Sequence, residues 1–232
     1  MRKPLVPFLA LLLATGGIAL AQGMAPTETV RVTVTNTTAQ PVSPPLLVSH
    51  DGSFAPFHLG AAASPELTLL AEDGAATGLA DAALATEGVY GVAVADGVLM
   101  PGASVTLEVA AGEGTVLTLL GMLVTTNDAF AVWSAYAQDG MMAMDGMDAM
   151  DGMRTMPGVV NDGVVRVYDA GTEANTELCA HIPGPPCGQM GARVTEGAEG
   201  AVALHGGILG VGDLDPQVVG WLHPVLAVAV ER

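Results

Sequence analysis

The chain has 232 residues, half of them hydrophobic, and its 24 acidic and 7 basic residues give a formal net charge of −17 at pH 7. Nucleic acids and anionic membranes are poor partners for such a chain, because binding to them depends on Lys and Arg. The balance favours cations, basic proteins or simply solubility. Aromatic residues are few, so we expect a core of small aliphatic side chains.

The first 21 residues have the pattern of a secretory signal peptide. Arg2 and Lys3 precede a short apolar run, and Ala19-Leu20-Ala21 is a small-x-small cleavage site. A transmembrane anchor is the alternative, but a proline and two glycines interrupt the apolar stretch. We therefore expect an exported protein, periplasmic or extracellular, without a membrane span. Residues 22–232 are expected to form one domain.

Runs of alternating or β-branched residues, separated by turn residues, predict strands along most of the chain. The clearest covers 29–36, where every second residue is apolar. Others are expected at 46–49, 89–95, 104–110, 116–124, 164–167 and 225–230. Strands at this spacing predict an all-β fold, an antiparallel sandwich or barrel. At 125–128 we expect the chain to leave a strand and begin a loop.

A short helical insertion is predicted between two of these strands. Ser64 has the character of a helix cap and Pro65 suits the first helical position, with an end near Asp73-Gly74. A second helical turn or two is expected at 78–84. Before the insertion, His50 to Phe54 place a histidine, an acid and a serine close together, but we interpret this stretch as a turn rather than a hydrolase site.

Cys179 and Cys187 are the two cysteines of the chain. In an exported protein, a close pair predicts a disulfide, and the intervening prolines and glycine would bring the ends together. Zinc binding by Cys179, His181 and Cys187 is the alternative, but the sequence offers no evident fourth ligand.

A Met-rich stretch at 139–157 differs from the rest of the chain. It holds seven methionines, mostly three residues apart, with Asp and Gly between them. Glycines at this density disfavour a helix, so a low-complexity loop is the first interpretation. Thioethers are soft ligands, and Cu(I) binding is the alternative.

An acidic loop at 168–177 follows the predicted strand at 164–167. It contains Asp169, Glu173 and Glu177 around a glycine that permits a tight turn. Oxygen donors crowded at a strand end suit a hard cation such as Ca²⁺. Asp128 places another acid at a strand end. A solvated acidic turn is the alternative, and we interpret Asp213 and Asp215 as turn residues first and spare cation ligands second.

Several motifs along residues 29–231 resemble the spondin N-terminal domain family in its exported bacterial branch. The block from Asp169 to Glu173, with the sequence Asp-Ala-Gly-Thr-acid, is the most specific of them. The others are Ser43-Pro44-Pro45, His50-Asp51-Gly52-Ser53-Phe54, Ala63-Ser64-Pro65-Glu66-Leu67, Ala71-Glu72-Asp73-Gly74, Thr126-Asn127-Asp128 and Trp221-Leu222-His223-Pro224-Val225.

This resemblance implies a β-sandwich similar to C2 domains, with Ca²⁺ held by loops at one end and a role in extracellular adhesion. It maps the metal ligands onto Asp128, Asp169 and Glu173. Glu173 stands where animal members have Asp, and Asp128 is followed by Ala-Phe rather than Trp. The Met-rich stretch is not part of the family pattern.

The resulting hypothesis is a non-catalytic, calcium-binding module for adhesion or surface association. Its expected partners are a divalent cation and an extracellular or cell-surface protein or glycan. Periplasmic handling of Cu(I) on the Met-rich stretch is one alternative. A Ca²⁺-dependent hydrolase is another, although the sequence shows no nucleophile and base with a reason to be paired.

Overall fold

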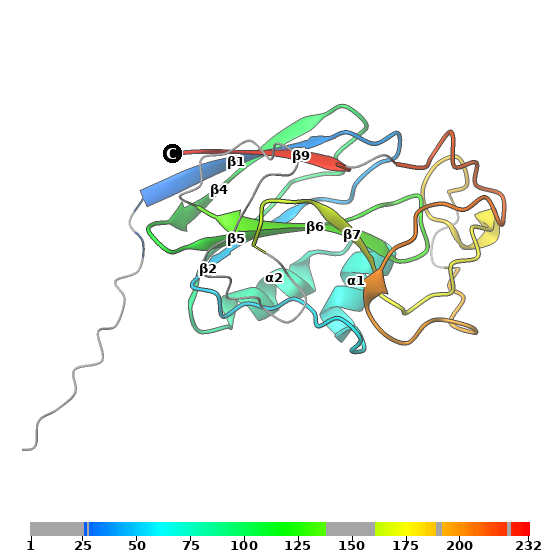
Figure 1. The fold of residues 1–232 in the computed structure, drawn as a ribbon, viewed down its shortest axis with the longest axis horizontal. Helices are drawn as coiled ribbons and strands as arrows, with labels where there is room; N and C mark the ends of the chain where they lie inside the picture. The colour runs from blue at the N-terminus through cyan, green and yellow to red at the C-terminus, as the bar shows by residue number, and fades with distance from the viewer. Residues whose placement is uncertain (1–25, 27, 138–160, 189–191, 222–223) are drawn as a thin grey trace, which may run out of the picture.

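Two antiparallel β-sheets form the fold in the computed structural model, which describes residues 26, 28–137, 161–188, 192–221 and 224–232 (Figure 1). The three-stranded sheet has the order β4 (Ser104–Ala111), β1 (Glu28–Asn36) and β9 (Leu226–Glu231). The six-stranded sheet has the order β3 (Val89–Val94), β2 (Leu46–His50), β5 (Val116–Met122), β6 (Ala129–Tyr136), β7 (Arg166–Asp169) and β8 (Ala203–Leu204). The predicted all-β sandwich is confirmed.

Strand β1 shows how the sequence pattern sets one face inward. Val32 and Val34 are fully buried, and Val32 pairs with Leu107 of β4 on one side and with Val230 of β9 on the other. The threonines between them point outward, where Thr33 bonds Thr106 of β4 at 2.9 Å between hydroxyl oxygens. Alternation with a period of two therefore separates the core face from the polar face.

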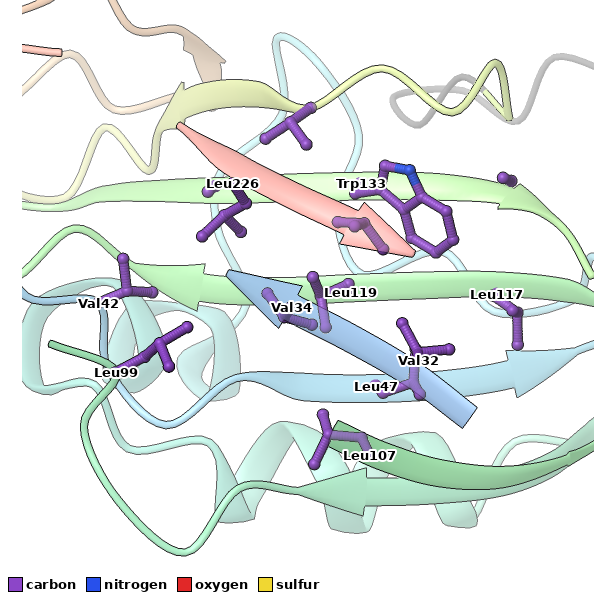
Figure 2. Close-up of a cluster of buried hydrophobic side chains, with 14 of the residues drawn as sticks. Val32, Val34, Val42, Leu47, Leu99, Leu107, Leu117, Leu119, Trp133 and Leu226 are labelled. Carbon is purple, nitrogen blue, oxygen red and sulfur yellow. The ribbon is translucent and has the colours of Figure 1, made fainter. Parts of the chain in front are cut away.

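The main hydrophobic core lies between the two sheets. Figure 2 shows Val32 and Val34 of β1 close to Leu47 of β2 and Leu119 of β5. Trp133 is the largest side chain of this cluster. Small aliphatic side chains dominate it, as the composition predicts, and their packing supplies most of the contact between the sheets.

Two short helices, α1 (Pro65–Asp73) and α2 (Thr77–Leu84), cover the other face of the six-stranded sheet (Figure 1). The Ser64 hydroxyl accepts a hydrogen bond from the Leu67 amide at 3.1 Å, and Gly74 ends α1 in the left-handed conformation. The predicted helical insertion is confirmed, with its cap. It creates a second core, in which Phe57, Phe130 and Tyr168 pack against one another.

The chain leaves β5 and turns at 124–128, as expected, but the strand that follows was not predicted. Residues 123–128 make a tight connection, and β6 begins at Ala129. All but the last residue of β6 are buried, because the opposing sheet covers one face and the helices cover the other. A strand buried on both faces does not alternate, and its alanines have low strand propensity, so periodicity missed it.

Cys179 and Cys187 form the predicted disulfide, with their Cα atoms 4.8 Å apart. The bond uses both sulfurs, so these cysteines do not serve as thiolate ligands for zinc. In the part of the chain that the structure describes, no helix is long and apolar enough to cross a membrane. The predicted signal peptide and the Met-rich stretch at 139–157 lie outside the described residues.

A matched pair of leucines tests the double-layered core. Leu119 is fully buried between the sheets, whereas Leu84 at the end of α2 is 63% exposed. We expect Leu119→Ala to lower the free energy of unfolding by about 2–5 kcal/mol, because it leaves a cavity. Leu84→Ala should lower it by less than about 0.5 kcal/mol. Urea unfolding followed by circular dichroism measures both, and equal losses would contradict this packing.

Candidate metal-binding loops

The antiparallel pairing of β6 with β7 brings two predicted site residues together. Ala129, the first residue of β6, pairs with Asp169, the last residue of β7. The next backbone contact is a hydrogen bond of 3.2 Å from the Ala170 amide to the Asp128 carbonyl. Asp128 and Asp169 are therefore neighbours, although 41 positions separate them. The chain after β7 forms loops beyond these strand ends, on the right in Figure 1.

Asp128 is fully buried and organises the start of the loop after β7. Its Oδ2 accepts hydrogen bonds from the Thr172 amide at 2.7 Å, the Glu173 amide at 3.0 Å and the Thr172 hydroxyl at 3.1 Å. Its Oδ1 has no hydrogen-bond partner among the described residues. One carboxylate oxygen is thus saturated, while the other is buried without compensation, an arrangement that is costly in the absence of a ligand.

The pKa of Asp128 is raised from 3.8 to about 6. Burial is the main cause, and the negative charge of Asp169 adds to it. The hydrogen bonds from Glu173 and Thr172 lower the pKa and offset part of this rise. Near neutral pH, burial and mutual repulsion therefore disfavour the charged forms of these two acids, and a bound cation would offset this effect.

Asp169 has hydrogen-bond donors on both oxygens. The Gly171 amide donates to Oδ1 at 2.6 Å, and the Asn175 side-chain amide donates to Oδ2. Gly171 adopts a φ of +69°, and a Cβ at that position would collide with the backbone of Ala201. The tight turn expected at this glycine is confirmed, since a side chain here would displace the backbone of Ala201, just before β8.

A short chain of hydrogen bonds runs from Asp169 through Asn175 to His205. The Oδ1 of Asn175 lies 3.2 Å from His205 Nε2, and the Gly207 amide donates to His205 Nδ1 at 2.9 Å. Burial lowers the pKa of His205, although the charges of Asp169 and Glu177 oppose this shift. Since Nδ1 is an acceptor, the neutral ring donates from Nε2 and holds the Asn175 amide toward Asp169.

Glu173 lies next to Asp128, and its carboxylate faces a different set of charges. Its Oε1 is 3.8 Å from Nη1 of Arg193, which also pairs with Glu72 and Asp73. The pKa of Glu173 is raised to about 7, chiefly by burial. The nearby Asn127 amide lowers it, and the charges of Asp128 and Asp73 raise it. Arg193 is distant in sequence from Glu72 and Asp73, and no local sequence pattern predicted that it would pair with them.

Glu177 has a structural role that the sequence interpretation did not predict. Its buried carboxylate accepts hydrogen bonds from the Leu209 amide at 2.5 Å and the Val211 amide at 2.9 Å. Its backbone carbonyl accepts a bond from the Asp213 amide at 2.7 Å. Glu177 thus attaches the 209–213 segment to the acidic loop. Its positive φ of 53° was not detectable from its residue type.

Asp213 and Asp215 act as turn residues, which was the first of their two interpretations. Asp213 Oδ2 accepts a bond from the Cys179 amide at 2.8 Å, and Asp215 Oδ1 accepts one from the Gln217 amide at 2.8 Å. At the other predicted turn, His50 Nε2 lies 2.9 Å from the Thr118 hydroxyl. The side chain of His50 is therefore bonded inside the sheet, consistent with a turn at 50–54 rather than a triad with Ser53.

The structure thus joins Asp128 to Asp169 and places Glu173 next to Asp128 but turned toward Arg193. Among the described residues, no three His, Cys, Asp or Glu side chains form a group that could hold a metal ion on their own. No protein-family model matches the chain, and no curated protein matches it. The resemblance to the spondin N-terminal domain therefore stays a prediction.

The raised pKa of Asp128 predicts a specific pH dependence of stability. Between pH 3.8 and about pH 6, Asp128 holds a proton in the folded state that it has already released in the unfolded state. The stability from this group is therefore present at low pH and lost as the pH rises through about 6. With chelator present, wild type should lose about 2 kcal/mol relative to Asp128→Asn between pH 4.5 and 7.5.

This difference is measured by urea unfolding at several pH values. Comparing the two proteins cancels the contributions of titrating groups that do not interact with Asp128, such as His50, whose pKa burial lowers to about 4 against the charge of Asp51. A difference that does not change with pH would contradict the buried charge at Asp128.

The role of Glu177 predicts a local opening. In Glu177→Ala the amides of Leu209 and Val211 lose their acceptors, and their hydrogen exchange should accelerate by about tenfold or more. The exposed Glu196→Ala serves as the control and should leave both amides protected. Unchanged protection in Glu177→Ala would show that other contacts hold this segment.

Proposed function

We propose that this chain is an exported, calcium-binding β-sandwich module that acts in adhesion or surface association without catalysis. The single observation that carries the proposal is the unpartnered Oδ1 of Asp128, fully buried beside Asp169. Buried polar atoms in native structures nearly always have partners, and an unsatisfied carboxylate oxygen next to a second carboxylate favours a cation.

The donor set supports Ca²⁺ in particular. Asp128 and Asp169 offer carboxylate oxygens, which are hard ligands, and the loops around them can add backbone carbonyls and water. Ca²⁺ accepts six to eight oxygens in irregular geometry, whereas Mg²⁺ demands a near-ideal octahedron. The cation would supply positive charge that offsets the repulsion between the two acids. It fits the residues present, and their side chains would hold it.

Glu173 is the third predicted ligand, but we expect it to contribute least. Its carboxylate lies at ion-pair distance from Arg193, so Ca²⁺ would have to compete with a guanidinium for it. Its backbone amide already serves the site by donating to Asp128. Asp128 and Asp169 should therefore dominate the affinity for calcium.

The adhesion part of the proposal rests on the sequence. The signal peptide pattern supports export, and the resemblance to spondin domains supports a role outside the cell. A chain with 24 acidic and 7 basic residues suits a basic protein partner. Calcium modules outside cells typically bind at about 10⁻⁴–10⁻³ M, and ordering of the acidic loop by the ion would preorganise this end of the sandwich for a partner.

Thermal unfolding tests calcium binding directly. With about 10 mM Ca²⁺ replacing chelator, mass action should raise the melting temperature of wild type by about 3–10 °C. Asp128→Asn and Asp169→Asn should abolish the rise, and Glu173→Gln should reduce it by less. The exposed Glu113→Gln is the matched control and should behave as wild type.

Two outcomes would overturn the proposal. Either wild type shows no shift with Ca²⁺, or the asparagine variants, folded by circular dichroism, shift as much as wild type. A shift of equal size with Mg²⁺ would contradict the assignment of calcium.

A further inference from the structure

A small cavity lies next to the candidate calcium site, between the end of α1 and the loops that follow β5 and β7. Its volume is about 220 Å³, which exceeds the space of one water molecule but falls below that of sites for drug-sized ligands. Pro44, Val98, Met122 and Val124 contribute to its apolar wall. A ligand of this cavity is therefore small and partly apolar.

The polar wall of the cavity carries more negative than positive charge. Glu72, Asp73 and Glu173 line it together with Arg193. The side chains of Glu72 and Glu173 are only 6% and 4% exposed, so water screens them poorly. Arg193 contacts all three carboxylates, and its guanidinium is shared among them. This wall therefore retains the capacity to bind a second cation.

Asn127 supplies an independent sign of a missing ligand. It lines the same cavity, and its side chain is 2% exposed. Its Oδ1 accepts a bond from the Glu177 amide at 3.4 Å, while its Nδ2, although near Glu173, has no hydrogen-bond partner within the described ranges. A buried donor without an acceptor costs about 1–3 kcal/mol, and a ligand with an oxygen at this position would recover it.

We propose that this cavity binds a small organic cation of the amino alcohol or amino amide type. The ammonium group pairs with Glu72 and Glu173, the neighbouring oxygen accepts from Asn127 Nδ2, and a short alkyl arm packs on the apolar wall. Arg193 is the internal competitor of this ligand, since it occupies the same carboxylates. The site adjoins the proposed calcium pair of Asp128 and Asp169 and shares Glu173 with the predicted calcium ligands, but the proposal does not require that calcium binds.

The apolar wall and the unpartnered donor argue against an inorganic cation here. A metal ion has no use for alkyl surface and cannot accept a hydrogen bond from Asn127. Binding of an anion is disfavoured, because three carboxylates surround the one guanidinium and repel negative charge. An alkyl chain with an ammonium group and an adjacent hydroxyl or carbonyl satisfies all three features of the cavity together.

Calorimetric titration with matched probes tests the proposal. We expect 2-aminobutan-1-ol to bind, whereas the neutral butane-1,2-diol and the anionic 2-hydroxybutyrate should not. Removing the competitor in Arg193→Ala should tighten binding of the amine by about tenfold or more, because buried carboxylates then lack a partner. Adding Glu72→Gln to that variant should reverse the gain. Arg31→Ala, which removes an exposed ion pair with Glu231, is the matched control and should bind as wild type.

If Arg193→Ala is unstable, melting temperature replaces affinity, and the amine should raise it more in the variant than in wild type. In wild type, the side-chain amide signal of Asn127 should shift with the amine and not with the diol. Equal binding of amine and diol, or no gain of affinity or stability in Arg193→Ala, would overturn the proposal. All titrations are run with Ca²⁺ and with chelator, so failure of the calcium proposal leaves this test intact.

Discussion

The buried carboxylate of Asp128 is the interaction on which this end of the molecule depends. One of its oxygens gathers the backbone of Thr172 and Glu173, and so decides how the chain turns after β7. That turn leads into the segment that contains Asn175 and Glu177. Burying a carboxylate costs free energy because the group loses its hydration. Here hydrogen bonds, or a bound cation, offset that loss.

The rest of the fold serves to hold this carboxylate in place. Strands β5 and β6 are buried on both faces, by the opposing sheet on one side and by the α1–α2 insertion on the other. A strand confined in this way cannot shift its register without exposing its whole apolar set. The position of Asp128 relative to Asp169 is thus fixed by the register between β6 and β7.

Charge is distributed unevenly around the acidic loop. Asp128 and Asp169 are neighbours that accept hydrogen bonds from amides and form no ion pair among the described residues, whereas Glu173 shares Arg193 with Glu72 and Asp73. Two adjoining regions of negative charge therefore have different chemistry. The first offers a carboxylate oxygen to which no described residue donates, and this oxygen suits a hard ion. The second combines charge with apolar surface and the Asn127 amide, whose Nδ2 has no acceptor at hydrogen-bond distance in the part of the chain that the structure describes.

The sequence alone was sufficient for the fold class, the strand at 29–36, the capped helix at 64–74, the disulfide and the glycine turn after β7. These depend on local periodicity, capping and turn chemistry, which neighbouring residues determine. Tertiary structure decided the rest. Strand β6 was not predicted because a strand buried on both faces does not alternate between apolar and polar residues. The contacts of Arg193, Glu177 and His205 join segments that are far apart in the sequence and meet only in the folded chain. The proximity of Asp128 and Asp169 was expected from resemblance, but it is the antiparallel register of β6 and β7 that produces it, since pairing between strands is a property of the folded chain.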